Sequence, residues 1–325
     1  MKKRLFSGIQ PSGEIHIGNY LGALKNWVSL MAEFESIYCV VDYHALTSLE
    51  QPQGFQARIL NTAAMLMAVG IDPSKCTLFV QSDVPEHTEL CWILSTVIHI
   101  GHLERMIQFK EKAKQHEDNI NVGLFTYPVL QTADIVLYKA ETVPVGEDQI
   151  QHIELAREIV RRFNTKFAPV FPEPQERVTR AARILGLDGK AKMSKSLGNT
   201  IGLTDTPDMI QNKLKIAVTD INRKRRSDPG DPSICNLFTL HNHFSPAAEV
   251  GCIASDCRSA AIGCIDCKKK LANNMIQELA PFRDNYLSFL ARPDRVRDAL
   301  RQGALHCRAI AQKTLDEVKT AVGMK

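Results

Sequence analysis

The chain has 325 residues, of which 44% are hydrophobic and 23% are charged, and these proportions are typical of a globular protein of roughly two domains. No apolar run approaches the ~20 residues that a membrane-spanning helix needs, and the basic N-terminus is not followed by the apolar stretch of a signal peptide. We therefore expect a cytoplasmic protein with no membrane partner. The net charge of +4 is compatible with a polyanionic partner but does not identify one.

Strand-like and helix-like segments alternate through residues 1–183. In chain order we expect a strand at 4–9, a helix at 17–31, a strand at 37–42, a helix at 53–69 closed by Gly70, a strand at 77–81, helices at 86–99, 103–115 and 126–138, a strand at 142–145 and a helix at 147–163. This alternation predicts an α/β fold, with a mainly parallel sheet and helices on both faces. Neither Gly-x-Gly-x-x-Gly nor Gly-x-x-x-x-Gly-Lys follows any of these strands, which excludes a standard dinucleotide or P-loop site.

Helical patterns dominate the rest of the chain. We expect helices at 206–218, 268–291 and 294–322, with a Pro/Gly-rich charged segment at 227–232 between them. The second part is therefore predicted to be a helical domain whose final helix returns to pack on the first. Two basic runs, 222–226 and 268–270, are each about as readily a solvated surface as an RNA contact.

The segment Gln10-Pro-Ser-Gly-Glu-Ile-His-Ile-Gly-Asn19 leads from the first strand into the first helix. Backbone N–H groups at such a junction favour an anionic phosphate. Gly18 and Gly22 lie one turn apart and would allow a nucleotide or another backbone to approach closely. His16 and Asn19 would donate hydrogen bonds to phosphate oxygens. Taken alone, this short motif is more readily an ordinary turn with a surface histidine.

A second motif, Lys192-Met-Ser-Lys-Ser196, lies between Gly189 and Gly198, which suggests a mobile loop. The two motifs occur in this order about 175 residues apart, with strand and helix units between them, which makes a joint match far more specific than either alone. Together they resemble the HIGN and KMSKS signatures of class I aminoacyl-tRNA synthetases. Over nearly its whole length the chain resembles the bacterial tryptophanyl-tRNA synthetases, in their iron–sulfur-containing variant.

This resemblance implies that the protein activates L-tryptophan with ATP and Mg²⁺ and transfers it to tRNA(Trp), acting as a homodimer with no DNA partner. It implies a Rossmann-like catalytic domain over 1–183, a helical domain over 184–290 that binds the tRNA anticodon, and a C-terminal helix over 291–325 that packs back on the catalytic domain. Lys192, Lys195, His16 and Asn19 would be catalytic. The ATP site would comprise Gln10, Pro11, Ser12, Gly18, Asn19, Gly146, Glu147, Asp148, Ile184, Lys192, Met193, Ser194, Lys195 and Ser196.

The chemistry of these residues suits adenylate formation. The substrate carboxylate attacks the α-phosphorus directly, so the protein contributes positioning and neutralisation of spreading negative charge. The two lysines of the KMSKS loop would stabilise the pyrophosphate leaving group. Glu147 and Asp148 are acceptors suited to ribose hydroxyls, although favourable interaction with the helix dipole would also explain them, above all Glu147.

Asp134 lies in an otherwise apolar helical pattern, so we expect it to be buried and to need a donor. The donor is either a group of the fold itself or the indole N–H of tryptophan. By resemblance, the rest of the tryptophan site would comprise Phe6, Gly8, His44, Gln108, Tyr127, Gln131, Val143 and Val145, although core packing explains the apolar members about as well. A tyrosine-specific relative would share the fold and motifs, and a non-catalytic sensor of tryptophan or tRNA is a further alternative.

Nine cysteines are present. Cys39, Cys76, Cys91 and Cys307 lie in strand or helix patterns and are most simply buried small apolar residues. A second set, Cys235, Cys257, Cys264 and Cys267, suggests a metal site, with Cys252 an extra member of that region. Structural Zn²⁺ is one candidate. The presence of a single Cys-x-x-Cys and the family resemblance favour a [4Fe–4S] cluster.

Overall fold

A computed structural model of the chain describes residues 2–49, 51–108, 120–178 and 184–325. Contacts between residues divide the chain into two compact units, and each is described by itself. The first unit comprises Met1–Gly13, Asn26–Arg180 and Phe289–Lys325, and the second comprises Glu14–Lys25 and Ala181–Ser288. The predicted domain boundary after residue 183 falls at the end of 179–183, outside the described residues.

The first unit is built on a five-stranded sheet in the order β3-β2-β1-β4-β5. The strands are β1 Arg4–Ile9, β2 Glu35–Val40, β3 Thr77–Val80, β4 Thr142–Val145 and β5 Gln175–Val178. Every recorded pairing between them is parallel, which confirms the predicted α/β fold. The chain moves from β1 outward to β3, and then β4 and β5 are added on the other side of β1. The strand order therefore reverses between β1 and β4, the place where parallel sheets bind ligands at their carboxyl edge.

Six helices were predicted before residue 183; the one at 17–31 is described with the second unit, and the described parts of the other five match with small shifts at their ends. They are α4 Phe55–Ala68, α5 Glu86–Ser95, α8 Val122–Val136 and α9 Ile150–Lys166, while α6 Ile100–Glu104 covers only the start of the helix expected at 103–115, which runs into undescribed residues. Gly70 follows α4 with φ of +109°, a conformation that favours glycine. The short elements α3 Asp42–Leu46 and η2 Gln81–Asp83 at strand ends were not predicted, whereas η4 Glu147–Gln149 is a 3₁₀ turn at the start of the helix expected at 147–163.

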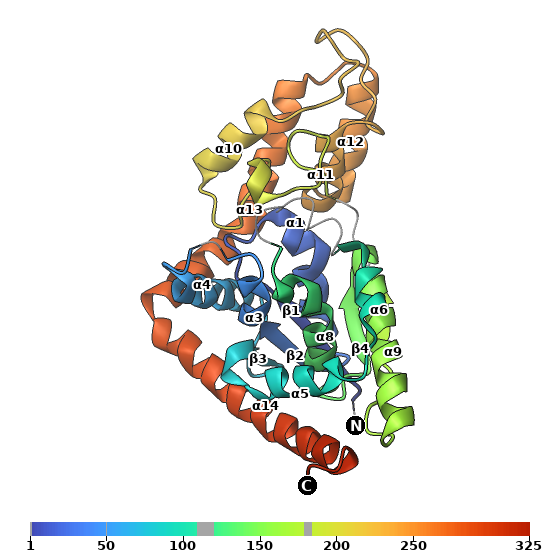
Figure 1. Cartoon of the computed structure of the whole chain (residues 1–325). Helices are drawn as coiled ribbons and strands as arrows, with labels where there is room; N and C mark the ends of the chain where they lie inside the picture. The colour runs from blue at the N-terminus through green and yellow to red at the C-terminus, as the bar shows by residue number, and fades with distance from the viewer. Residues whose placement is uncertain (1, 50, 109–119, 179–183) are drawn as a thin grey trace. The chain divides into compact units, whose positions relative to one another are not determined.

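The last helix, α14 Pro293–Ala321, packs beside β3 in the first unit, as Figure 1 shows. The two backbones approach closely because Gly303 faces the strand. A Cβ atom at this position would lie 2.0 Å from the carbonyl oxygen of Leu78, so only glycine permits this distance between them. Cys307, one turn further along the helix, is fully buried.

The second unit contains α1 Ile17–Asn19, η1 Tyr20–Leu24, η5 Lys195–Leu197, α10 Pro207–Ile216, α11 Asn236–Phe244 and α12 Ala247–Arg258. Two helices belong to both units. α13 Cys264–Ala291 begins in the second unit and ends in the first, and in α2 Lys25–Leu30 only Lys25 belongs to the second unit. The single helix predicted at 17–31 is thus three consecutive pieces, because η1 is a π-helical turn in which the amide of Lys25 donates to the Tyr20 carbonyl. Neither α11 nor α12 was predicted.

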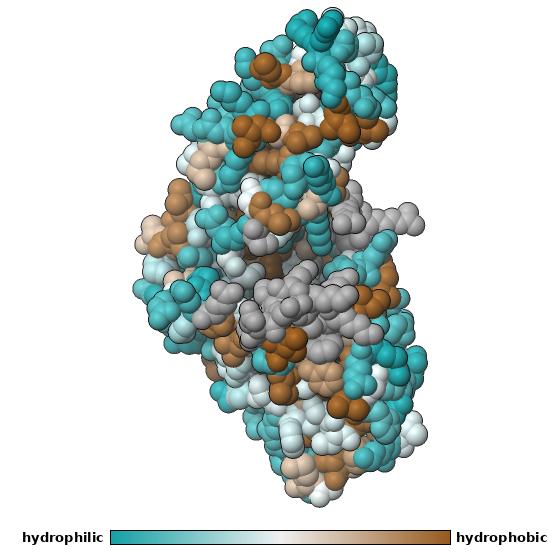
Figure 2. Space-filling view, turned by 45° about the horizontal axis from the view of Figure 1, so that its top comes forward, coloured by the Kyte–Doolittle hydropathy of each residue, from teal (hydrophilic) through white to brown (hydrophobic). Residues whose placement is uncertain are grey.

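Most large apolar side chains in the described parts of the chain are buried, and in Figure 2 hydrophilic residues separate the apolar ones that reach the surface. Four exceptions come from the region of α5, α6 and α8: Trp92 is 72% exposed, Ile100 66%, Ile107 58% and Val122 77%. Among the described residues, no helix is both long and apolar enough to cross a bilayer.

Candidate active site

His16 caps the helix that opens the HIGN segment. Its Nδ1 atom accepts a hydrogen bond from the Gly18 amide at 3.1 Å, and its own amide donates to Oδ1 of Asn19 at 3.1 Å. The two residues therefore form a capping box, in which each side chain accepts a hydrogen bond from a backbone N–H at the start of the helix. Because Nδ1 and the Asn19 oxygen are both occupied, the groups left to face a ligand are the Nε2 atom of His16 and the Nδ2 amide of Asn19.

His16 is neutral at physiological pH. Burial, followed by the positive charge of Lys192, lowers its pKa from 6.5 to about 4. A neutral ring that accepts at Nδ1 must carry its proton on Nε2. The donor that His16 has left is therefore a neutral Nε2–H.

The KMSKS loop is held at its base by a short hairpin. Leu185 and Lys192 form an antiparallel bridge, and the Met193 amide donates to the Ile184 carbonyl at 3.1 Å. Asn199 closes the loop from the other side, since its Oδ1 accepts from the Ser194 amide at 2.8 Å. Asn199 is 5% exposed, whereas Lys192 and Lys195 are exposed. The base is fixed and the lysines are left free to reach a ligand.

The structure brings the two motifs together within the second unit. The amide of Ile17 donates to the Ile201 carbonyl at 2.9 Å, and the amide of Leu203 donates to the Ile15 carbonyl at 3.0 Å. A Cβ atom on Gly18 would lie 3.4 Å from the Cβ of Met193, so Met193 of the KMSKS loop packs directly on the HIGN helix. At Gly22, by contrast, a Cβ would meet nothing within 4 Å.

Asp134 is 1% exposed and bonds to three side chains of the first unit. His87 contacts its Oδ1 through Nδ1 at 2.7 Å, and Gln81 donates to the same oxygen at 2.7 Å. His44 contacts Oδ2 through Nε2 at 2.8 Å. Burial would raise the pKa of this carboxyl group, but the interactions with His87 and His44 outweigh burial and hold the pKa well below that of an ordinary aspartate.

These donors come from the carboxyl edge of the sheet. His44 follows β2, and Gln81 follows β3 directly, so the parallel arrangement places both beside the helix that carries Asp134. Asp134 is buried, as predicted, and its hydrogen-bond partners in the structure are side chains of the fold itself. His44 was expected in the tryptophan site, but Gln81 and His87 were missed. A polar residue immediately after a buried strand was the signal that could have identified Gln81.

Other predicted tryptophan-site residues lie on neighbouring elements of the same unit. Phe6, Val143 and Val145 are buried on β1 and β4, on the two sides of the strand reversal, and Gly8 lies near the end of β1. Tyr127, 8% exposed, bonds through its hydroxyl to Nε2 of His152 at 2.8 Å. Gln131 is half-buried on α8, and Gln108 is half-buried at the end of the described stretch before residue 109.

The segment after β4 is open to solvent. Gly146, Glu147 and Asp148 are all exposed, and Gly146 precedes the 3₁₀ turn that carries the two carboxylates. A Cβ on Gly146 would lie 2.7 Å from Oδ1 of Asp148, so glycine lets that carboxylate fold over the backbone. Gln10, Pro11 and Ser12 follow β1 at the same edge of the sheet.

Cys235, Cys257, Cys264 and Cys267, here called the four-cysteine group, are half-buried free thiols in the second unit. Electrostatic interactions link all four to one another. Nη1 of Arg223 lies 3.9 Å from the Sγ atoms of both Cys257 and Cys264. Among the residues that the structure describes, no three His, Cys, Asp or Glu side chains stand at the spacing of a bound metal ion.

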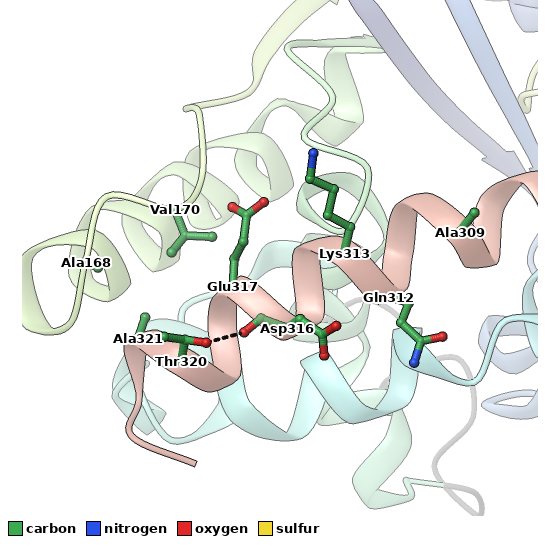
Figure 3. Close-up of a pocket in the computed structure, with 9 residues that line it drawn as sticks. All are labelled: Ala168, Val170, Ala309, Gln312, Lys313, Asp316, Glu317, Thr320 and Ala321. Atoms are coloured by element: carbon green, nitrogen blue, oxygen red, sulfur yellow. Dashed lines mark hydrogen bonds between the residues drawn. The ribbon is translucent and has the colours of Figure 1, made fainter. Parts of the chain in front are cut away.

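A cavity of about 760 Å³ lies elsewhere in the first unit, between α14 and the segment after α9. Figure 3 shows Lys313 and Glu317 on one face of α14, with Ala168 and Val170 across the opening. Glu317 is already paired with Lys139 at 2.6 Å. The residues that line this cavity include none of those predicted for the ATP or tryptophan sites, so it does not extend the candidate active site.

The sequence and the structure are both similar to those of known proteins. A family model described as tRNA synthetases class I (W and Y) matches residues 1–280. The tryptophan–tRNA ligase of Deinococcus radiodurans is 50% identical over 98% of each chain, and that of Wolinella succinogenes is 44% identical over 100% of this chain and 99% of its own. The tryptophanyl-tRNA synthetase of Campylobacter jejuni, solved with ADP and tryptophan, superposes with a TM-score of 0.90 at 35% identity over 98% of this chain and 99% of its own. The chain belongs to the class I tRNA synthetases of the tryptophan and tyrosine family.

Proposed function

We propose that the chain works as a tryptophan–tRNA ligase, which activates L-tryptophan with ATP and transfers it to tRNA(Trp). Full-length identity of 40–50% to tryptophan–tRNA ligases is the observation that carries this conclusion. The assignment of individual residues to the reaction is our proposal, and the hydrogen bonds described above support it.

Asp134 would select the substrate. An ionised carboxylate has about four acceptor positions on its two oxygens. Oδ1 is used twice, by Gln81 and His87, whereas Oδ2 is used once, by His44. The remaining position on Oδ2 suits the indole N–H, a single donor with no acceptor. Phenylalanine would leave that buried position unpaired, and a site of this kind can discriminate by up to ~10⁴–10⁵-fold.

His16 and Asn19 would bind the phosphates of ATP through the donors that their mutual cap leaves open. A neutral Nε2–H and an amide can hold phosphate oxygens without adding charge to the bound state. Positive charge would come instead from Lys192 and Lys195, and from the Mg²⁺ that accompanies ATP. Both lysines stand on a loop with a fixed base. Their stabilisation of negative charge would increase as charge develops on the departing pyrophosphate.

The remaining predicted ATP contacts are at the carboxyl edge of the sheet and in the second unit. Gln10, Pro11 and Ser12 would meet the phosphates, and Gly146, Glu147 and Asp148 the adenosine, because exposed carboxylates suit ribose hydroxyls. Ile184, Met193, Ser194 and Ser196 of the second unit are the remaining residues that we propose to contact ATP. Phe6, Gly8, Gln108, Tyr127, Gln131, Val143 and Val145 would line the tryptophan site around Asp134 and His44.

The four-cysteine group would hold a [4Fe–4S] cluster, with Zn²⁺ as the alternative. Four thiols that influence one another are a suitable donor set for either. Burial raises the pKa of the Cys257 thiol, and the guanidinium of Arg223 beside it acts in the opposite direction. The buried Nε of Arg223 has no hydrogen-bond partner among the described residues. This donor would be available to a negatively charged cluster beside it. The cluster would act as a structural staple for the helical region.

The second unit also offers a surface suited to tRNA. A cavity of about 450 Å³ between α10 and α13 is lined by three lysines, three amides and three apolar residues: Lys215, Lys268, Lys269, Gln211, Asn212, Asn273, Leu214, Ile265 and Ala272. Lysines with amides are typical of contacts to a phosphate backbone. We therefore assign anticodon binding to the helical region of 184–290, and catalysis to 1–183, with 291–325 completing the catalytic unit. The protein would act in the cytoplasm.

A homodimer would explain the exposed apolar side chains of the first unit. Trp92, Ile100 and Val122 extend from helices that contact one another, since α8 packs on both α5 and α6. Large exposed apolar side chains on adjoining elements mark interaction surfaces, and tryptophan is especially enriched at them. A second copy of the chain is the partner we expect.

Exchange of labelled pyrophosphate into ATP tests the proposed function. We expect exchange that depends on L-tryptophan and is far weaker with L-tyrosine or L-phenylalanine. Exchange with tyrosine instead would assign the chain to the other specificity of the family. Binding of tryptophan without any exchange would indicate a sensor rather than an enzyme.

A further inference from the structure

His87 is a buried histidine that the reaction described above does not use. It lies on α5 with 0% of its surface exposed, and both ring nitrogens are hydrogen-bonded. Nδ1 is 2.7 Å from Oδ1 of Asp134, and Nε2 is 2.7 Å from the hydroxyl of Tyr138. A buried ring with a carboxylate on one side and a phenol on the other is an oriented connection, because the carboxylate requires a proton on the nitrogen that faces it and the phenol holds the opposite nitrogen.

We infer that His87 and Tyr138 are positioning residues for substrate selection: they hold Oδ1 of Asp134 so that Oδ2 is presented to the indole. This inference rests on the proposed function. It adds that the selectivity of Asp134 depends on a tyrosine and a histidine that do not touch the substrate.

The direction of the hydrogen bonds follows from the chemistry of the groups. An ionised aspartate can only accept, so Nδ1 of His87 carries a proton. In the neutral ring, Nε2 then accepts from the Tyr138 hydroxyl. The other neutral tautomer would place a lone pair against the carboxylate. Asp134 therefore sets the tautomer of His87, and the Tyr138 hydroxyl holds the ring in place through the nitrogen on its other side.

Aromatic rings also pack against these two side chains, while the hydrogen bonds set which atoms of His87 and Tyr138 face one another. The ring of Phe79 stacks on His87 with centroids 5.8 Å apart and planes at 20°. Tyr138 stacks on Phe6 with centroids 5.6 Å apart and planes at 14°. Phe6 is itself a predicted wall of the tryptophan site, so the series of contacts Phe6–Tyr138–His87–Asp134 runs from the wall of that site to its acceptor.

The two oxygens of Asp134 have different numbers of hydrogen-bond partners, and the bond from His87 makes this difference. With His87 in place, Oδ1 has two donors and Oδ2 has one. Without His87 each oxygen would have one, so the carboxylate could turn and offer either oxygen to a donor. We expect the loss of preference for the indole N–H to be larger than any loss of general activity.

The test compares L-tryptophan with β-(benzothiophen-3-yl)-L-alanine, which has a sulfur in place of the indole N–H. Pyrophosphate exchange is measured for wild type and for His87→Leu, His87→Asn and Tyr138→Phe, with Phe79→Leu as a control that removes a stacked ring and no hydrogen bond. For His87→Leu we expect kcat/KM for tryptophan to fall about 10- to 100-fold while that for the analogue changes little. His87→Asn, whose amide can still donate to Oδ1, should retain most of the preference, and Tyr138→Phe should be intermediate.

The control separates positioning from stability. Phe79→Leu should lower the melting temperature without changing the ratio of the two kcat/KM values. If Tyr138→Phe and either His87 variant lower both substrates equally, the inference is wrong and these hydrogen bonds are only structural. If His87→Leu does not fold, His87→Asn and Tyr138→Phe still decide the question. If wild type shows no tryptophan-dependent exchange, the proposed function fails instead.

Discussion

Met193 packs on Gly18, so a side chain of the KMSKS loop lies against a position of the HIGN helix that has no Cβ. A Cβ at Gly18 would lie 3.4 Å from the Cβ of Met193 and 2.9 Å from Nδ1 of His16. The second distance is shorter than a relaxed contact, so the His16 ring would have to move. The glycine thus allows the loop to pack and the histidine to cap the helix in the same small space.

Replacing Gly18 with alanine should therefore impair ATP use more than stability. Displacing His16 removes both the cap and the aim of its Nε2–H, and we expect kcat/KM for ATP to fall by about 10- to 100-fold, the range for losing a good hydrogen bond to a charged group. Gly22→Ala is the matched control, since its new methyl group meets open space. A similar loss of melting temperature in both variants, with equal kinetics, would contradict this view.

His16 should also give a measurable pH dependence of stability. Its pKa is 6.5 in the unfolded chain and about 4 in the fold, so below pH 6.5 the unfolded state takes up a proton that the folded state refuses. The stabilising effect of a neutral His16 is complete above pH 6.5 and is lost as the pH falls toward 4. We expect the melting temperature of His16→Gln to fall less steeply than wild type between these values. Equal slopes would show that His16 titrates normally in the fold.

Lys195→Ala should slow tryptophan activation by orders of magnitude while leaving tryptophan binding largely intact. The exposed ammonium is expected to act on the departing pyrophosphate rather than on the bound amino acid. Lys190→Ala is a suitable control, because Lys190 is an exposed lysine of the same hairpin. Exchange rates and the affinity for tryptophan, measured separately, give the result. Near-normal exchange in Lys195→Ala would refute the role.

Much of the first unit could be predicted because local patterns encode it. β1 to β4 are short apolar runs that end in turns. In the second unit, both signature motifs could be identified from the order of their residues alone. β5 was missed because Gln-Glu-Arg-Val contains only one apolar residue. The strand lies at the edge of the sheet and is mostly exposed, so it lacks the apolar run of a strand that is covered on both faces. The π turn of Tyr20–Leu24 was missed because apolar periodicity does not record a change of hydrogen-bond partner.

The candidate site divides in the same way. Burial of Asp134 was predictable from its apolar neighbours, since a carboxylate in such a helix must be partnered. Its partners were not, because Gln81 and His87 are 53 and 47 residues away along the chain and meet it only through the strand order. The neutral state of His16 likewise depends on burial and on Lys192, which no local pattern contains.

Replacing one cysteine of the four-cysteine group with serine should prevent the protein from binding iron. Protein purified without oxygen is expected to show an absorption band at about 400 nm from a thiolate-bound iron–sulfur cluster. Cys257→Ser and Cys264→Ser should lose the band, and a melting-temperature decrease should accompany the loss. Cys252→Ser is the control, since Cys252 is an exposed thiol outside the group. Colourless protein that contains zinc would favour Zn²⁺ as the metal.

Charge reversal at Lys269 and Lys270 should weaken tRNA binding without touching amino acid activation. Both side chains are exposed on α13, whereas Lys268 beside them donates to the carbonyls of Lys215 and Ala217 and is better left intact. For Lys269→Glu with Lys270→Glu we expect a higher KM for tRNA(Trp), and a salt dependence of binding that is shallower by about one unit of slope for each phosphate that the variant no longer neutralises. Pyrophosphate exchange without tRNA should match wild type. Lys313→Glu, an exposed lysine of α14, controls for net charge, and an equal effect there would mean that only the overall charge matters.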